Sequence, residues 1–202
     1  MLPKVIEHVM KENLRFLTAF LKNPTKVGAI APSSPDLARQ MVSDLKPDRE
    51  NIILEIGVGT GAITRFIEPI LPDENSYLGI ELDPRLYSDL RLKFPGLKIV
   101  QANAADAYKI HRQSGLGPVR YLLCCLPFVS LPSSVADQIC DEIDRFMEDG
   151  CLLKIFQYAH GYYLPPALRL RERMRRRYGR SRRSPLVVRN VPPAYTLTWS
   201  TL

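Results

Sequence analysis

The sequence predicts an α/β fold in which a seven-stranded, mostly parallel sheet is covered by helices on both faces. Three observations support this fold class. From residue 51 onward, short apolar segments alternate with longer amphipathic ones, as in consecutive strand–helix–strand units. A glycine-rich turn at residues 57–61 follows the first apolar segment. Two apolar segments close the chain, and the five residues between them are too few for a parallel connection, so this last pair is predicted to be antiparallel.

The length and composition indicate one domain. The 202 residues are 46% hydrophobic and 24% charged, which are ordinary values for a globular protein. We expect a single domain over residues 1–202, with N-terminal helices over 1–45 acting as a membrane or lid element and the core over 51–202. No segment resembles a signal peptide or a membrane-spanning helix, so a cytoplasmic protein is expected. The spacing of the histidines and cysteines fits no metal site, and we expect no metal at Cys124, Cys125, Cys140 and Cys151.

Two helices are expected before the core. Residues 5–22 carry apolar side chains at three- and four-residue steps, which predicts an amphipathic helix. That helix either packs on the core or lies in a membrane interface with its lysines on the headgroups. Ser33 or Ser34 can cap a second helix that reaches about Leu45.

The core elements follow in alternation. Strands are expected at residues 52–56, 77–82, 97–100, 119–126 and 151–158. Helices are expected at residues 61–71, 84–94, 104–113 and 133–147. The antiparallel strands at the end are expected at residues 186–189 and 195–201.

The turn after the first strand has the chemistry of a cofactor site. Ligands of an open parallel sheet bind at the carboxyl ends of its strands, where glycines let the backbone approach closely. Glu55 precedes the turn and suits an ammonium group better than a pyrophosphate, and Glu81 at the end of the second strand can accept hydrogen bonds from both ribose hydroxyls. These acids favour S-adenosylmethionine over NAD. The predicted cradle is formed by Gly57, Gly59, Thr60 and Gly61.

Further cofactor contacts are expected beyond the turn. The side-chain carbonyl of Asn103 can accept from the adenine amino group, and the Ala104 N–H can reach a ring nitrogen. A solvated turn at Asn103 is the alternative. We also place Leu82, Leu126 and Ser34 in the cofactor site.

The fourth strand ends in Cys124-Cys-Leu-Pro-Phe128. In enzymes that methylate amino groups, this place often reads Asn-Leu-Pro followed by Phe or Tyr, and the aromatic ring flanks the acceptor nitrogen. Leu126, Pro127 and Phe128 fit this pattern, but Cys125 stands where the pattern has Asn. A thiol is a poor hydrogen-bond acceptor, which argues against a nucleobase as the acceptor.

The chain resembles the bacterial phospholipid N-methyltransferases over nearly its whole length. The segments that carry the resemblance are 20–24, 31–34, 55–61, 126–127, 156–158 and 189–194. That family converts phosphatidylethanolamine to phosphatidylcholine, while a close relative acts on ornithine lipids and the rRNA adenine dimethylases share the Leu-Pro-aromatic motif. The resemblance implies a Rossmann-like class I methyltransferase that is monomeric and peripheral on the inner face of the cell membrane.

Several side chains are candidates for the methyl-transfer step. The acceptor amine must lose a proton before it attacks, and Tyr158, His160 and Tyr108 are candidate positioning groups or proton routes. A quaternary ammonium product would be tolerated by aromatic rings, for which Phe128 and Tyr158 are candidates together with Tyr162 and Tyr163. Ordinary packing is the alternative role for each tyrosine.

The segment Arg169–Arg183 concentrates the positive charge of the chain. It holds nine arginines and one acidic residue, whereas the net charge of the whole chain is +7. Such a segment suits an anionic membrane surface, and a solvated helix face or a nucleic-acid site are the alternatives. Tyr178 is its only aromatic residue, so a base-stacking platform is not supported and no nucleic-acid partner is expected.

Overall fold

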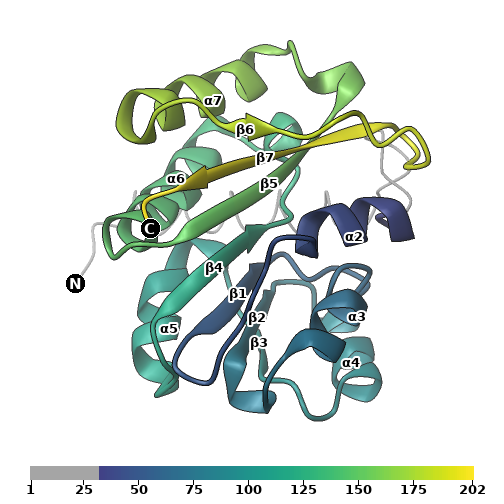
Figure 1. Cartoon of the computed structure of the whole chain (residues 1–202), viewed down its shortest axis with the longest axis vertical. Coiled ribbons are helices and arrows are strands. Elements are labelled where there is room, and N and C mark those ends of the chain that lie inside the picture. The colour runs from purple at the N-terminus through teal and green to yellow at the C-terminus, as the bar shows by residue number, and fades with distance from the viewer. Residues whose placement is uncertain (1–31) are drawn as a thin grey trace, which may run out of the picture.

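A computed structural model describes residues 32–202, and it shows one seven-stranded sheet in the order β3-β2-β1-β4-β5-β7-β6 (Figure 1). β1 to β5 are parallel, whereas β7 runs antiparallel to both β5 and β6. This arrangement confirms the predicted fold class. The strands are β1 Ile52–Ile56, β2 Tyr77–Glu81, β3 Ile99–Gln101, β4 Val119–Cys124, β5 Leu152–Tyr158, β6 Arg182–Arg183 and β7 Ala194–Ser200.

Helices cover both faces of the sheet. The helices are α2 Pro35–Val42, α3 Thr64–Ile67, α4 Pro84–Lys93, α5 Ala107–Ser114, α6 Ser133–Glu148 and α7 Pro165–Tyr178. Short 3-10 turns are η2 Glu68–Ile70, η3 Glu74–Ser76, η4 Ala104–Asp106, η5 Phe128–Ser130 and η6 Ala159–Gly161. The predicted helix at residues 5–22 lies outside the described residues.

Each face of the sheet builds its own core. Ile52, Leu54 and Ile56 of β1 pack in a cluster with side chains of α5, α6 and α7. Ile53 points the other way, into a cluster with side chains of α2, α3 and α4. Successive residues of a strand face opposite sides, so an uninterrupted apolar strand fits a sheet that is buried on both faces.

Local capping explains where two helices begin. The Asp83 carboxylate accepts from the backbone N–H groups of Arg85 and Leu86 at 2.8 and 3.1 Å and so starts α4. The Ser34 hydroxyl accepts from the N–H of Leu37 at 3.2 Å and starts α2, which confirms the predicted cap.

The end of the chain differs from the prediction. The strand expected at residues 186–189 is absent, and β6 lies earlier, at Arg182–Arg183. Val187 makes only an isolated bridge to Ala194. Pro185 cannot donate to a sheet ladder, and the chain turns away after Val187, so regular pairing stops there. β3 is likewise shifted, to residues 99–101.

α2 is part of the core rather than of a separate lid. Leu37, Ala38 and Met41 have no exposed surface. Beyond the helix, Asp44 forms ion pairs with Lys154 on β5 and with Arg182 on β6. The predicted division of the chain at residue 45 therefore does not hold for α2.

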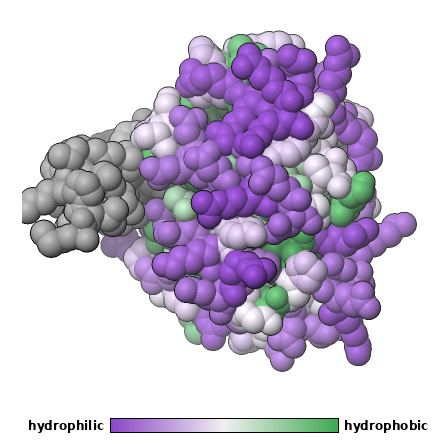
Figure 2. Space-filling view, turned by 90° about the vertical axis from the view of Figure 1, so that its left-hand side faces the viewer, coloured by the Kyte–Doolittle hydropathy of each residue, from purple (hydrophilic) through white to green (hydrophobic). Residues whose placement is uncertain are grey.

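The surface is largely polar on one side. The face turned to the left of Figure 1 is mainly hydrophilic, with apolar side chains scattered over it (Figure 2). Within residues 32–202, no helix has the length and apolar character needed to cross a membrane.

Candidate active site

A cavity opens at the carboxyl ends of β1, β2 and β4, where the predicted motifs meet. Its wall combines the glycine turn after β1, the end of β2 and the segment after β4. Small residues that follow β3 complete it. The lining residues are Gly57, Gly59, Ile80, Glu81, Leu82, Ala102, Ala104, Cys125, Leu126 and Pro127.

The glycine turn requires glycine for two reasons. Gly57 has φ of +77°, and a Cβ there would lie 2.6 Å from Cδ2 of Leu126. Gly61 has φ of +79°, and its Cβ would lie 2.5 Å from Phe94. A side chain at either position would be strained in its backbone and would collide with a neighbour. The conformation of the turn therefore requires glycine at both positions.

Glu81 fixes the glycine turn to β2. Its Oε2 accepts from the N–H of Gly59 at 2.7 Å, and its Oε1 accepts from the N–H of Asp83 at 2.9 Å. Burial raises the pKa of Glu81, although the backbone hydrogen bonds from Asp83 and Gly59 oppose the rise. Two carboxylate oxygens have about four acceptor positions, so the side chain retains capacity for ribose hydroxyls in the cavity.

Glu55 lies beneath the turn and is fully buried. Its Oε2 accepts from the hydroxyls of Tyr77 at 2.7 Å and Thr64 at 2.8 Å. Burial raises the pKa of Glu55 to about 7, although those two hydroxyls oppose the rise. Its Oε1 has no hydrogen-bond partner among the described residues. Direct contact between Glu55 and the cofactor's ammonium stays a prediction, because the carboxylate does not line the cavity.

The other predicted cofactor residues differ in position. Leu82, Ala104 and Leu126 line the cavity as expected. The Asn103 carbonyl caps η4 by accepting from the N–H of Ala105 at 3.0 Å, so one of its acceptor positions is already used. Thr60 is exposed at the tip of the turn.

The side of the cavity toward β5 presents neutral polar groups. Cys125 follows β4 and lines the cavity, and Tyr158 ends the neighbouring strand β5. Burial raises the pKa of both side chains; the charge of Glu55 adds to the rise at Cys125, and the charge of Cys125 adds to the rise at Tyr158. His160 is exposed and stacks on Tyr158 with ring centroids 5.8 Å apart. Tyr158 and His160 thus lie side by side, with Tyr158 near Cys125, and their roles in methyl transfer stay predictions.

Two predicted catalytic residues lie elsewhere. Phe128 is buried in the core and lines a separate hollow between α6 and α7. Tyr108 packs on Phe146 of α6, and its hydroxyl donates to Asp149 at 2.9 Å. Neither Phe128 nor Tyr108 lines the described cavity, because the turn η5 and the helix α5 direct the two rings toward α6, and their roles in methyl transfer stay predictions.

The predicted aromatic cage is also not assembled. The ring of Tyr162 already faces a cation, since the guanidinium of Arg171 lies 3.8 Å from its centroid. Tyr163 is 75% exposed and packs edge-on against Tyr162. Of the four candidate aromatic residues, Tyr158 alone lies beside Cys125.

Asn190 is a residue that sequence reasoning missed. Its side chain is buried, and its Oδ1 accepts from the backbone N–H of Ser34 at 2.8 Å. Its Nδ2 donates to the carbonyl of Pro192 at 2.6 Å. The signal lay in the two segments that carry the family resemblance, 31–34 and 189–194, because the hydrogen bond joins them. Ser34 thus sits beside the end of β5, and it does not line the described cavity.

Comparison with known proteins gives related sequences and folds. The chain is 30% identical over 129 residues to the ornithine lipid N-methyltransferase of Singulisphaera acidiphila, covering 62% of this chain and 67% of that protein. It is 32% identical over 99 residues to ribosomal RNA small subunit methyltransferase A of Chlorobium phaeobacteroides, covering 48% of this chain and 35% of that protein. A scan against protein-family models found no match.

Solved structures share the fold. A methyltransferase from Anabaena variabilis superimposes with a TM-score of 0.64 at 11% identity, covering 93% of this chain and 94% of that one. One from Aquifex aeolicus gives a TM-score of 0.60 at 12% identity, covering 89% and 98%. The chain belongs to the class I S-adenosylmethionine-dependent methyltransferases. The predicted cofactor is thereby confirmed.

The cavity of this methyltransferase fits its cofactor. The glycine turn leaves open space, because a Cβ at Gly59 would meet no described atom within 4 Å. Glu81 offers acceptors for the ribose, while Leu82, Ala104 and Leu126 offer apolar surface for the adenine. When bound, the cofactor supplies an electrophilic methyl group on a sulfonium.

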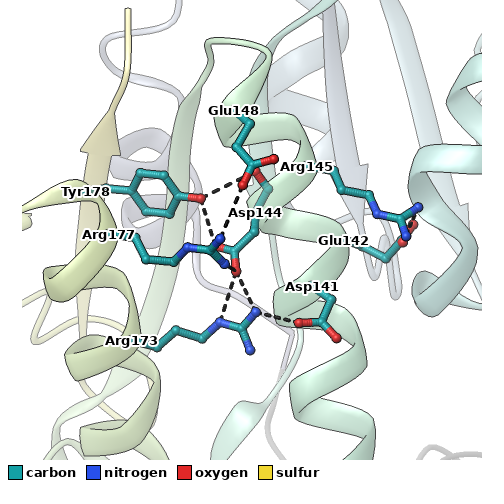
Figure 3. A network of polar contacts seen from close by, with 8 residues as sticks. All are labelled: Asp141, Glu142, Asp144, Arg145, Glu148, Arg173, Arg177 and Tyr178. Carbon is teal, nitrogen blue, oxygen red and sulfur yellow. Dashed lines mark hydrogen bonds and ion pairs between the residues drawn. The ribbon is translucent and has the colours of Figure 1, made fainter.

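The arginine segment of the methyltransferase is less free than its sequence suggests. On α7, Arg173 binds Asp141 and Asp144 of α6, and Arg177 binds Asp144 and Glu148 (Figure 3). The hydroxyl of Tyr178 also donates to Asp144 at 2.9 Å. In the described residues, five of the nine arginines of the segment form ion pairs, with the carboxylates Asp44, Asp141, Asp144, Glu148 and Glu172. Part of the cluster therefore fastens α7 to α6, and a smaller positive excess is left for a partner.

Proposed function

We propose that this methyltransferase transfers methyl groups to the primary amine of an aminolipid headgroup at a membrane surface. Phosphatidylethanolamine, converted towards phosphatidylcholine, is the leading acceptor, and an ornithine lipid is the alternative. The observation that carries the proposal is the neutral wall formed by Cys125 and Tyr158 beside the cofactor cavity. The similarity to an ornithine lipid N-methyltransferase over two thirds of that relative supports the same acceptor class.

The neutral wall suits an amine that must lose a proton. A lipid amine is cationic in water, and only its neutral form has the lone pair that attacks. The raised pKa values of Cys125 and Tyr158 keep both groups uncharged at neutral pH. Such surroundings disfavour the ammonium form by desolvation, and the amine releases its proton to solvent water before transfer.

The reaction balances as a displacement at carbon. The amine nitrogen forms a bond to the methyl carbon, the sulfur–methyl bond breaks, and the sulfonium becomes a neutral thioether. The protein acts mainly by positioning the two reactants. The glycine turn and Glu81 hold the cofactor on one side of the cavity, and Leu126 and Pro127 form another part of the cavity wall. In this proposal, Tyr158 orients the amine through its hydroxyl.

Membrane attachment belongs to the same proposal. The predicted helix at 5–22 is one candidate element. The uncompensated arginines of Arg169–Arg183 are the other, since each basic residue near an anionic surface contributes on the order of 1 kcal/mol.

Methylation of an rRNA adenine is the second candidate function. The similarity to ribosomal RNA small subunit methyltransferase A favours it, although the match spans about a third of that relative. Cys125 opposes it, because a thiol cannot hold an adenine amino group as an amide carbonyl can.

A transfer assay separates these functions. The protein is incubated with methyl-labelled cofactor and, in parallel, with vesicles of phosphatidylethanolamine, vesicles containing ornithine lipid, phosphatidylcholine vesicles as a control without acceptor, and undermodified small-subunit rRNA. We expect label in one or both aminolipids. Label in rRNA alone, or in no lipid while S-adenosylhomocysteine binds, would refute the proposal.

A further inference from the structure

Exposed apolar side chains gather at the carboxyl end of β5. Val188 and Val191 in the loop before β7 are 67% and 72% exposed. Tyr163, Leu164 and Leu168, around the start of α7, are 75%, 43% and 45% exposed. These five residues are called the apolar rim below. Single exposed apolar residues are common on proteins, but grouped ones mark contact surfaces.

The two parts of the apolar rim lie at one edge of the molecule. Tyr162 joins them, since its ring is 5.2 Å from the ring of Tyr163 and 5.1 Å from that of Tyr195 at the start of β7. Figure 1 shows the start of α7 and the loop before β7 together at the right-hand side, near the start of α2.

The loop is built to present its valines. Asn190, between them, is 1% exposed and anchors the loop through its bonds to Ser34 and Pro192. The carbonyl of Pro193 accepts from the N–H of Ala159 at 2.8 Å. A loop fastened at its centre holds Val188 and Val191 outward, and nothing in the described chain covers these two side chains.

The apolar rim also lies next to the acceptor side of the cavity. Ala194, which follows the loop, pairs with Tyr158 at the end of β5. A surface resting on the apolar rim is therefore brought to the strand end that carries Tyr158.

The part of the chain that carries the apolar rim is basic. After Asp149 the sequence holds a single acidic residue, Glu172. That carboxylate is bound by Arg175 and Arg176. Arg189 is exposed between the two valines, and Arg169 is exposed beside Leu168. Apolar side chains with interspersed arginines fit the boundary between acyl chains and anionic headgroups.

We propose that the apolar rim is the surface on which the enzyme docks to an anionic lipid bilayer. The valines and Tyr163 enter the headgroup boundary, Arg169 and Arg189 contact lipid phosphates, and the end of β5 faces the headgroups. The proposal rests on the proposed lipid acceptor, because docking there is useful only if the substrate lies in the membrane.

Cosedimentation of the full chain with vesicles tests the docking surface. The vesicles contain phosphatidylcholine and phosphatidylglycerol in equal parts, so no lipid carries an acceptor amine. The variants are Val188→Asp and Val191→Asp, with Leu92→Asp as a matched control. Leu92 is 83% exposed near the end of α4, a helix that contributes no residue to the apolar rim.

We expect each valine variant to lower the vesicle partition constant roughly tenfold, which corresponds to losing the burial of one valine. Leu92→Asp should leave it unchanged, and all three variants should bind S-adenosylhomocysteine as the parent does. Equal partition in the valine variants, or an equal fall in Leu92→Asp, would overturn the proposal. So would a loss of thermal stability in the valine variants alone, which would mean that another part of the chain covers the valines.

A separate assay keeps the two proposals apart. Methyl transfer to a short-chain phosphatidylethanolamine dispersed as monomers needs no docking. If the enzyme methylates that lipid but the valine variants bind vesicles as the parent does, the docking surface alone is refuted. If the valine variants bind vesicles more weakly, as expected, but the enzyme methylates no aminolipid, the proposed function alone is refuted. If the valine variants lose binding to an rRNA fragment but keep vesicle binding, the surface belongs to a nucleic-acid site and the docking proposal is overturned.

Discussion

The Oδ1 of Asn190 accepts the backbone N–H of Ser34 at 2.8 Å across 156 residues of sequence. One buried amide thereby fixes the start of α2 to the loop before β7. The contact closes the core on the β5 side, where Tyr158 ends its strand. We predict that Asn190→Ala lowers the free energy of unfolding by roughly 1–3 kcal/mol, because it leaves the partly buried N–H of Ser34 unpaired. Urea denaturation measures this, with the exposed Asn75→Ala as the control.

Gly57→Ala should abolish cofactor binding and destabilise the fold. The new Cβ would need φ of +77° and would lie 2.6 Å from Leu126. Gly115→Ala is the matched control, because Gly115 has φ of +73° but a Cβ there meets no described atom within 4 Å. The control should lose only about 1–2 kcal/mol of stability and retain cofactor binding. Calorimetric titration with S-adenosylhomocysteine and thermal unfolding check both effects, and similar behaviour of the two variants would contradict the steric explanation.

Glu81→Gln should weaken cofactor binding selectively. The amide keeps one acceptor oxygen, so either the N–H of Gly59 or that of Asp83 loses its partner. The charge that would hold the ribose hydroxyls also disappears. We expect the dissociation constant of S-adenosylhomocysteine to rise roughly 10- to 100-fold, as for the loss of a charged hydrogen bond. Glu74→Gln, at an exposed position, should leave the constant unchanged.

Glu55 should make the stability of the cofactor-free protein fall as the pH rises. Its pKa is about 7 in the folded state and 4.5 ordinarily, so the folded state holds a proton that the unfolded chain has released. Stability is then highest below about pH 4.5, falls up to about pH 7 and is level above that, with a total loss on the order of 3 kcal/mol from this group. The raised pKa of Glu81 acts in the same direction.

Glu55→Gln tests this dependence. The glutamine oxygen can accept from Tyr77 and Thr64, while no proton binds at neutral pH. Thermal unfolding between pH 5 and pH 8 should therefore show a smaller decline in the variant than in the parent. An equal decline in both proteins would assign the pH dependence to other groups.

The ion pair between Asp44 and Lys154 should be needed for the stability of the folded protein, because Lys154 is buried. Burial would raise the pKa of Asp44, but hydrogen bonds and charge from Lys154 and Arg182 bring it below the ordinary value. Its contribution to stability is therefore present at neutral pH and is lost on acidification. Asp44→Asn should cost roughly 3–5 kcal/mol by leaving a buried cation unpaired.

A second substitution checks the cause. Adding Lys154→Met to Asp44→Asn removes the buried charge, and the double variant should recover most of the stability in urea denaturation. If the double variant is no more stable than Asp44→Asn, the loss does not come from the unpaired lysine.

The sequence by itself determined the direction of the strands and the cofactor half of the site. Apolar periodicity marks strands that are buried on both faces, and Gly57, Glu55 and Glu81 stand at fixed distances from strand ends. Parallel strands end at one edge, so residues at those ends meet whatever the detailed packing is. The short gap near residue 190 predicted an antiparallel end, although the strand that pairs there begins earlier than expected.

The tertiary structure alone decided which side chains face the site and which charges are free. Phe128 and Tyr108 follow strands β4 and β3 as an active-site residue would, yet both rings point into contacts with α6. The Arg169–Arg183 segment is a run of like charge in sequence, but carboxylates on α6 and Asp44 neutralise much of it. Periodicity fixes which element a residue belongs to. The direction of a turn and the partner of a charge depend on residues brought near by folding, and Asn190 with Ser34 shows how far apart in sequence those residues can be.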